Sequence, residues 1–393
     1  MVVALVAAAV VGMSILLTSS PSTDVSPSPV PARTSYTEHP TIYINGDAQF
    51  NNTLYPSNGV VSGNGTVSNP YVIAGWDINA SAAFGITIWG TSAYFVIRDC
   101  YVHSGWLGGT GNYGIYVANC VNGVVRNNTV VDCNCGISLQ SSSDCTVSDN
   151  TCNYNENLGL YVMYLCHDNI IRNNTCGFNN YYGMSIQESN DNIVSDNNCS
   201  NNNVLGMYLT YWSSGNVVSN NTCVSNNPFG IFIQQSSGNT LTDNNCSDNG
   251  YGVYITQSSS YNNISSCEVS DNTVWGIYLE SGSYNRIWNN VFAGNGGGGT
   301  QAYDSGTSNW WNSSGSPHGY GNWWSDLTAP DDDLDGIVDW SYNLTGSAGA
   351  KDYYPLTTPP VPIPEFGAAP VVAMVLMAAI VLTVRARRRP PVA

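Results

Sequence analysis

Lysine is almost absent from this sequence. Lys351 is the only lysine among 393 residues; Lys and Arg together number 10, whereas Asp and Glu number 27. Four of the ten basic residues lie in the last nine positions, at 385 and 387–389. The rest of the chain has too few cations to neutralise a run of phosphates, which excludes nucleic-acid binding.

Charged residues of either sign are also scarce, at 9% of the chain. The formal net charge of -17 therefore reflects missing lysines rather than abundant carboxylates, and asparagine fills the polar positions instead. Intrinsic disorder is not expected, because hydrophobic residues (42%) and aromatic residues (11%) are sufficient for a sizeable core. The length allows one large domain or two medium ones.

The two ends of the chain predict export and membrane attachment. Residues 1–18 are apolar and indicate a signal peptide or N-terminal anchor, although the basic start of a signal is missing, which leaves open a start further upstream. We expect a disordered linker at 19–40, a proline-rich linker at 358–366, a transmembrane helix at 367–384 and a cytoplasmic arginine tail at 385–393. The tail places everything before the helix outside the cell. A buried core helix is the alternative for 367–384.

Pro364-Glu365-Phe366, the apolar stretch and the arginine tail together resemble the PEF-type C-terminal sorting signals of archaeal surface proteins. That resemblance implies recognition by a membrane protease-transpeptidase, which can replace the helix with another anchor. Eleven Asn-x-Ser/Thr sequons suit an extracellular, glycosylated surface. The expected location is the cell surface, and the expected partners include the membrane and this sorting enzyme.

An internal repeat organises the middle of the chain. A glycine followed by apolar-x-apolar recurs at Gly85, Gly114, Gly136, Gly159, Gly183, Gly206, Gly230, Gly252 and Gly276, with spacings of 22 to 24 after the first gap. Units of about 23 residues with period-2 alternation and polar turns suit three short parallel strands per coil. We predict an all-β, right-handed parallel β-helix of about nine coils over 84–300. An N-terminal cap at 41–83 and a C-terminal cap at 301–357 would close it.

Stacked coils predict ladders of like residues. One ladder runs through Asn128, Asn150, Asn174, Asn197, Asn221, Asn244 and Asn290, interrupted by Cys100 and Cys267, and a second through Asn169, Asn192, Asn216, Asn239, Asn262 and Asn285. In-register amides can pass hydrogen bonds from coil to coil, so these residues are interpreted as structural. A neighbouring slot alternates Asp with Asn from Asp99 to Asp243, which separates like charges. A calcium ladder along this slot is the alternative.

Twelve cysteines in an exported chain would ordinarily indicate disulfides. Five of them instead share one inward slot with Val and Phe: Cys152, Cys176, Cys199, Cys223 and Cys246. Stacked Cβ atoms roughly 4.8 Å apart exceed bridging distance, so these five are interpreted as small buried hydrophobic residues. Cys120, Cys133, Cys135, Cys145 and Cys166 lie nearer turns, where pairing is possible. A soft-metal site is the alternative, but no Met or His recurs in phase with the thiols.

The closing segment contains a candidate metal loop. Asp331, Asp333, Asp335 and Asp339 stand at positions 1, 3, 5 and 9 of a calcium-type loop, Gly336 stands at position 6, and Ile337 can supply a carbonyl at position 7. Position 12 is Tyr342 rather than the Glu of a full EF-hand, so the loop resembles the calcium loops of dockerin-like and thrombospondin-type repeats. We expect a structural Ca²⁺ that rigidifies the cap. A solvated acidic turn is the alternative.

The repeat also predicts an aromatic strip on its outer surface. The outward residue of the Gly-apolar-x-apolar phrase is Tyr116, Tyr161, Tyr208, Phe232, Tyr254 and Tyr278, with Ser138 and Ser185 between. Exposed rings along a rigid sheet could stack on sugars or on a partner protein. Ordinary stabilisation of the sheet surface by cross-strand pairs is the alternative.

The Gly-apolar-x-apolar, Ser-Ser-x-Asn and Asn-Asn-Thr phrases resemble the NosD-like right-handed β-helix family over residues 60–357. The resemblance implies the fold rather than an activity. Copper binding, attached to some members, finds no conspicuous His/Met ligand set here. Three hypotheses follow: a surface module that binds carbohydrate or cell-envelope proteins; a scaffold without a ligand; or a polysaccharide lyase, hydrolase or epimerase. The enzyme is the less favoured, because the glutamates are scattered and no signature of polygalacturonases or epimerases is visible.

Overall fold

A computed structural model describes residues 36–106, 109, 111–298, 301–313 and 320–360. Contacts divide the chain into two units, Met1–Tyr36 and Thr37–Ala393, and every element below belongs to the second unit. The predicted segment 1–18, the helix 367–384, the tail 385–393 and most of both predicted linkers lie outside the described residues. Within the described part of the chain, no helix is long and apolar enough to cross a membrane.

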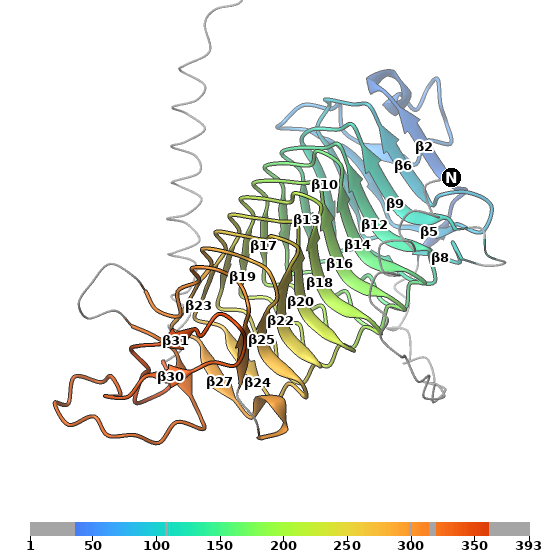
Figure 1. Cartoon of the computed structure of the whole chain (residues 1–393). Helices are drawn as coiled ribbons and strands as arrows, with labels where there is room; N and C mark the ends of the chain where they lie inside the picture. Colours follow the sequence, from blue (N-terminus) through green and yellow to red (C-terminus); the bar gives the residue numbers. More distant parts are fainter. Residues whose placement is uncertain (1–35, 107–108, 110, 299–300, 314–319, 361–393) are drawn as a thin grey trace, which may run out of the picture. The chain divides into compact units, whose positions relative to one another are not determined.

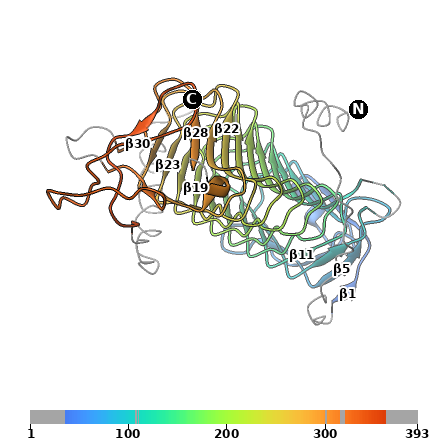
Figure 2. The same ribbon diagram turned by 60° about the horizontal axis from the view of Figure 1, so that its bottom comes forward.

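The described chain winds into coils whose strands form three sheets (Figures 1 and 2). Sheet B has 11 parallel strands: β2 (Ile42–Asn45), β6 (Ile86–Trp89), β9 (Tyr113–Ala118), β12 (Cys135–Gln140), β14 (Leu158–Met163), β16 (Tyr182–Gln187), β18 (Leu205–Thr210), β20 (Phe229–Gln234), β22 (Tyr251–Thr256), β25 (Trp275–Leu279) and β28 (Ala302–Asp304). Sheet C also has 11: β3 (Val60–Ser62), β4 (Tyr71–Ala74), β7 (Phe95–Arg98), β10 (Gly123–Arg126), β13 (Thr146–Ser148), β15 (Ile170–Arg172), β17 (Ile193–Ser195), β19 (Val217–Ser219), β21 (Thr240–Thr242), β23 (Asn263–Ser265) and β26 (Arg286–Trp288).

Sheet A is built from shorter strands at its two ends. These are β1 (Thr37–Glu38), β5 (Trp76–Asn79), β8 (Tyr101–His103) and β11 (Thr129–Val130), then β24 (Glu268–Ser270), β27 (Val291–Ala293) and β29 (Trp323–Trp324). Single parallel bridges from Thr129 to Glu268 connect the two groups. The remaining elements are the 3₁₀ turns η1 (Asp47–Phe50) and η3 (Asn295–Gly298) and the antiparallel pair β30 (Tyr342–Asn343) and β31 (Lys351–Asp352). The predicted right-handed parallel β-helix is confirmed.

The glycine of each repeat is required by the close approach of neighbouring coils. A Cβ atom built on Gly206 would lie 2.7 Å from the carbonyl oxygens of both Cys199 and Gly230, which no real side chain tolerates. The apolar residues that follow each glycine point inward and pair across coils, as Met184 does with Met207. The repeat phrase therefore encodes one close contact and two core positions per coil.

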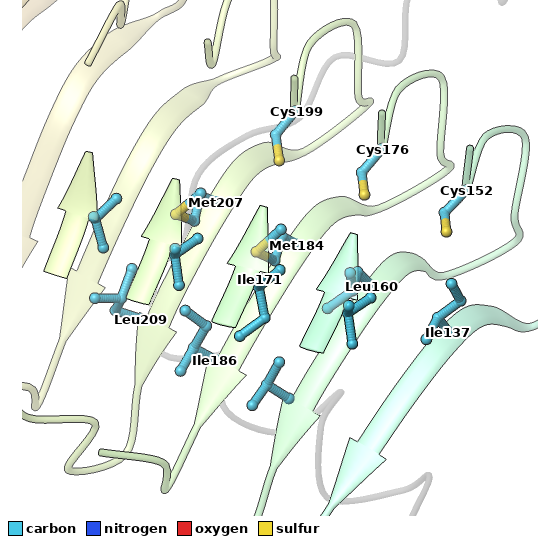
Figure 3. Close-up of a cluster of buried hydrophobic side chains, with 14 of the residues drawn as sticks. Ile137, Cys152, Leu160, Ile171, Cys176, Met184, Ile186, Cys199, Met207 and Leu209 are labelled. Carbon is cyan, nitrogen blue, oxygen red and sulfur yellow. The ribbon is translucent and has the colours of Figure 1, made fainter. Parts of the chain in front are cut away.

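All twelve cysteines are free and buried, so the pairing considered for those near turns does not occur. The column of five predicted as inward hydrophobic residues is confirmed, and Figure 3 shows three of its thiols pointing into the core beside Met184 and Met207. Burial holds the pKa of Cys246 well above its usual value, so this thiol stays protonated.

Both predicted asparagine ladders are present, and the structure adds a third. In the first, Asn174 Nδ2 donates to Asn197 Oδ1 at 2.9 Å, and Asn197 Nδ2 donates to Asn221 Oδ1 at 3.0 Å. The second repeats this geometry from Asn169 to Asn192 at 3.0 Å. The third contains Asn155, Asn179, Asn202, Asn226, Asn249, Asn272 and Asn295. Each amide also accepts a backbone N–H of the previous coil, which satisfies buried groups on both sides.

Every ladder has the same polarity, because wherever one ladder amide donates to another, its Nδ2 donates to the coil on the C-terminal side. A cysteine precedes the first amide of each ladder: Cys100, Cys133 and Cys145 supply the backbone N–H that the first Oδ1 accepts. An aspartate accepts from the last amide of each: Asn322 donates to Asp352 at 3.3 Å, Asn309 to Asp304 at 3.0 Å and, through Asn295 and Gln301, the third ladder to Asp326 at 2.6 Å. A carboxylate suits this end because it accepts without needing a further acceptor.

We predict that Asn197→Ala destabilises the protein by about 3 kcal/mol, because the mutation leaves Asn174 Nδ2 without its acceptor and Asn221 Oδ1 without its side-chain donor inside the core. Urea unfolding of the full chain measures the change. The matched control is Asn198→Ala, at the exposed next position, where less than about 0.5 kcal/mol is expected. Equal effects of the two mutations would contradict a structural ladder.

The buried carboxyl group of Asp352 should make the free energy of unfolding depend on pH. Burial raises its pKa to about 6 from a usual 3.8, although hydrogen bonds from Asn322, Trp324 and Tyr354 lower it. The folded state therefore binds the proton more tightly than the unfolded state, so its contribution is greatest below pH 4 and is lost as the pH rises through 6. A shift of about two units corresponds to about 3 kcal/mol. The difference in unfolding midpoint between the protein and Asp352→Asn should follow this curve; a difference independent of pH would contradict it.

Candidate functional site

The predicted aromatic strip lies on the outer face of sheet B. Tyr208 pairs with Phe232, Phe232 with Tyr254, and Tyr254 with Tyr278 in adjacent strands, so these four form an unbroken column. Tyr303 on β28 extends this column. Tyr116 and Tyr161 lie in the same column further toward the N-terminus, separated from one another by Ser138 and from Tyr208 by Ser185. The structure thus brings four of the six predicted residues together.

The rings of the column contact one another, stacked at three steps and edge-on between Phe232 and Tyr254. Centroids lie 5.1 Å apart for Tyr208 and Phe232, 5.0 Å for Tyr254 and Tyr278, and 4.4 Å for Tyr278 and Tyr303, with near-parallel planes. A second column at the residue before each repeat glycine meets the first edge-on, at Tyr182, Phe229 and Tyr251, while Trp275 is tilted against it. Offset stacking and edge contacts are the favourable geometries for aromatic rings. The two columns make one continuous aromatic surface.

The rings of this strip are more buried than the alternation along one strand suggests. Tyr116 is only 8% exposed and Tyr254 only 3%, and the other four are half-buried. Rings in adjacent coils cover each other's faces, which the alternation of one strand cannot reveal. The surface offers solvent a row of ring edges rather than open faces.

The tyrosine hydroxyls are held by a third column of polar side chains, which sequence reasoning missed. Tyr116 Oη donates to Gln140 Oε1 at 2.6 Å; Tyr161 and Tyr208 donate in the same way to Gln187 and Gln234. Tyr254 Oη donates to Glu280 Oε2 at 3.3 Å. The available signal was the Gln or Glu two positions after the outward residue in alternate coils. Burial raises the pKa of Tyr278 to about 12, so this hydroxyl is neutral at physiological pH.

The acidic loop is only partly assembled as predicted. Carboxylate oxygens of Asp331, Asp333 and Asp335 lie within 4.8 Å of one another. Asp331 Oδ2 accepts the Gly336 N–H at 3.1 Å, and the backbone at Gly336 has a φ of 87°, as position 6 requires. Asp339 instead accepts the Asp332 N–H at 2.9 Å.

Ile337 donates its N–H to Asp335 Oδ1 at 2.8 Å and lies in a bridge with Leu356. Three of the four predicted carboxylate ligands therefore converge, and Asp339 is not among them.

The alternating Asp/Asn slot forms the corner between sheets C and A. Every residue from Asp99 to Asp243 in this slot has a φ near 55°, the left-handed region that Asp and Asn tolerate best. Asn173 donates to Asp149 and Asn220 donates to Asp196, at 2.5 and 2.6 Å, so each Asn serves the Asp before it. The hydrogen bond from Asn173 lowers the pKa of Asp149. Each of these donors occupies one of the two carboxylate oxygens of its aspartate.

This corner also explains part of the sequon count. The sequons at Asn127, Asn173 and Asn220 consist of a corner residue, a ladder asparagine and a threonine that bridges to the next coil. Stacking alone thus generates the phrase. All three corner residues are exposed.

A polar cluster around His103 on sheet A was not predicted from the sequence. His103 Nε2 lies 3.0 Å from Asp77 Oδ1, and Nδ1 lies 2.8 Å from Ser104 Oγ. The Tyr101 ring stacks on the imidazole at 5.0 Å. Burial raises the pKa of Asp132, and the nearby His103 opposes that shift. The signal was the outward pair Tyr101 and His103 on β8, in register with Asp77 and Asn79 on β5.

Sequence and structure comparisons place the chain among parallel β-helix proteins. The family described as "Periplasmic copper-binding protein (NosD)" matches residues 40–211 and 165–329, and the chain belongs to this family. No curated protein matches the chain.

The similar solved structures include polysaccharide-modifying enzymes. A double mutant of the periplasmic alginate epimerase AlgG is 19% identical, with a TM-score of 0.53 over 61% of this chain and 67% of that chain. The Azotobacter vinelandii mannuronan C-5 epimerase AlgE4 A-module is 16% identical, with a TM-score of 0.49 over 70% and 85%. An alginate lyase from Paenibacillus sp. str. FPU-7 is 12% identical, with a TM-score of 0.41 over 69% and 95%. At these identities the likeness shows the fold alone.

Proposed function

We propose that the protein is an exported surface module that binds carbohydrate or cell-envelope proteins through the outer face of sheet B. The observation that carries this proposal is the unbroken aromatic column from Tyr208 to Tyr303. The column is flanked by polar side chains at Gln187, Gln234 and Glu280, so an apolar stripe has a hydrogen-bonding rim. Both parts are fixed by stacking before a ligand arrives, which reduces the entropy lost on binding.

The location completes the proposal. The family is described as periplasmic, which supports a compartment outside the cytoplasm. The helix 367–384 and the arginine tail would anchor the module in the membrane, where the sorting protease-transpeptidase would act on Pro364-Glu365-Phe366. Exposed sequons such as Asn127, Asn173 and Asn220 would carry glycans.

The family's description names copper, but the described residues do not offer a ligand set that suits copper. No three His or Cys groups converge there; the only group of three or more potential ligands is Asp331, Asp333 and Asp335. The cysteines are buried and unpaired, and three described histidines, His39, His103 and His167, bond to other partners. Carboxylate oxygens prefer hard cations, whereas copper prefers imidazole and sulfur. We therefore propose Ca²⁺ in the acidic loop, with a structural role.

A second candidate function is that of a polysaccharide-modifying enzyme. The His103–Asp77 pair favours it, because a hydrogen-bonded imidazole beside Tyr101 and Asp132 can exchange protons with a bound sugar. The related folds of alginate epimerases and lyases support the same reading at the level of architecture. The aromatic surface on sheet B is the more extensive feature, so binding remains the first proposal.

The combined change Tyr208→Ala and Phe232→Ala should weaken glycan or partner binding by about tenfold or more, because it removes two adjacent stacked rings from the column. Glycan-array binding by the full-length protein measures this. Phe178→Ala, an exposed aromatic outside sheet B, is the control and should bind normally. Undiminished binding by the double variant contradicts the proposal. Release of new reducing ends or unsaturated uronates, lost in His103→Ala, would instead establish the enzyme.

Calcium at saturating concentration should raise the thermal unfolding midpoint, and a chelator should reverse it, since a ligand at 100 times its Kd stabilises by about 2.7 kcal/mol. Asp331→Asn combined with Asp333→Asn should abolish the response. Asp332→Asn lies in the same loop outside the converging set and should retain it. A response that survives the double change would place calcium elsewhere.

A further inference from the structure

The turn between sheets B and C changes its residue type over the last coils. The residue before Cys145 is Asp144, and the residues before the next four second-ladder asparagines are Asp168, Asp191, Gly215 and Gly238, all with φ between 54° and 69°. In the next two coils this residue is Tyr261 and Tyr284, with φ of 58° and 56°. The left-handed region costs a residue with a bulky side chain roughly 1 kcal/mol, whereas Asp and Gly adopt it readily. Bulky residues adopt this conformation at other turns as well, such as Tyr154 and Phe178, so the surroundings of the two tyrosines decide what they can do.

Both tyrosines face solvent and are organised together. Tyr261 is 64% exposed and Tyr284 is 41% exposed, and their rings stack at 5.1 Å with planes 11° apart. Trp310, which is 39% exposed, continues the row 6.0 Å from Tyr284. The three rings therefore form an open platform, more accessible than the column on sheet B.

An arginine lies beside this platform, at a position where the preceding coils carry uncharged residues. The outward column of sheet C reads Thr146, Ile170, Ile193, Val217, Thr240, Asn263 and Arg286 in register. The Arg286 guanidinium carbon lies 5.6 Å from the Trp310 ring centroid, a cation–π contact. Arg286 forms no ion pair within the described residues, and its buried Nε has no hydrogen-bond partner. In a chain with 27 acidic residues, this unpaired guanidinium is available for an external anion through its Nη groups, because Nε itself is buried.

We propose that Tyr261, Tyr284, Trp310 and Arg286 form a binding site for an acidic sugar, a hexuronate unit of a polysaccharide. The polarised C–H groups of a pyranose ring would pack on the electron-rich ring faces, and the sugar carboxylate would accept hydrogen bonds from the planar guanidinium fork. The contact with Trp310 holds Arg286 in place before binding. This site deepens the proposed function by naming a ligand class, but it uses none of the residues of the sheet B surface.

The test compares two polymers of the same backbone: polygalacturonate and its carboxyl-reduced, neutral form. Titration of the full-length protein is run near 0.15 M salt, where the Debye length is about 8 Å, because the net charge of -17 otherwise repels a polyanion. We expect tighter binding of the polyuronate. Arg286→Gln should weaken it about tenfold and leave the neutral polymer unaffected. Arg286→Lys, which keeps the charge but not the fork, should be intermediate.

A second variant separates binding from folding. Tyr284→Gly introduces the residue that the coils at Gly215 and Gly238 carry, so the thermal midpoint should not fall, yet binding of both polymers should weaken. Asp191→Gly, at the same turn position three or more coils away, is the control and should bind both polymers normally.

The outcomes distinguish this site from the sheet B surface. Polyuronate binding lost in Arg286→Gln and kept in the Tyr208→Ala, Phe232→Ala variant supports the site even if the sheet B proposal fails. The reverse pattern overturns the site and leaves the sheet B proposal standing. Absence of polyuronate binding by the unchanged protein, or equal affinity for both polymers, also overturns it.

Discussion

The hydrogen bond from one asparagine amide to the next is the interaction on which this β-helix depends. Asn197 shows the full pattern: it donates to its counterpart in the following coil and to a backbone carbonyl of the preceding one, and an amide oxygen in the next coil accepts its backbone N–H. An amide can form all of these hydrogen bonds only if every coil keeps the same register. That requirement explains the glycine at each close approach and the Asp or Asn at each left-handed corner. The shortage of lysine is consistent with this requirement, because the lysine side chain donates hydrogen bonds but cannot accept them and so does not suit the core, the corner or the ladder positions.

The fold could be predicted from the sequence because the same residue types are required at the same positions of every coil, and this requirement produces a visible repeat. Two ladders were visible from their flanking Ser-Ser-x-Asn and Asn-Asn-Thr phrases. The third was missed because it has no such phrase and because its distance to the next repeat glycine is not constant: Asn226 precedes Gly230 by four residues, but Asn249 precedes Gly252 by three. The closing aspartates were missed for a different reason. Asp352 reaches Asn322 across 30 residues of cap that has no repeat.

The candidate sites were less predictable because they depend on departures from the repeat. Period-2 alternation correctly placed Tyr208 and Phe232 on the outside of sheet B, but ring exposure depends on the side chains of the adjacent coils on either side. Tyr261 and Tyr284 lie in turns, where no alternation applies; they share the left-handed conformation of the residues of earlier coils and differ from them only in residue type. In the acidic loop, spacing identified the three converging carboxylates, whereas Asp339 was drawn to the Asp332 N–H instead.

Because the three ladders run in the same direction, the length of the β-helix can change by whole coils. Inside the stack, every coil presents donors to its successor and acceptors to its predecessor, so a coil inserted or removed as a whole leaves no amide unmatched. Only the two ends of each ladder use other residue types. A cysteine precedes the first amide, and Asp304, Asp326 or Asp352 accepts the last hydrogen bond. Gene duplication within the repeats could therefore lengthen this protein while the same two ends are reused, whereas loss of the closing segment would leave all three rows of buried donors unterminated at once.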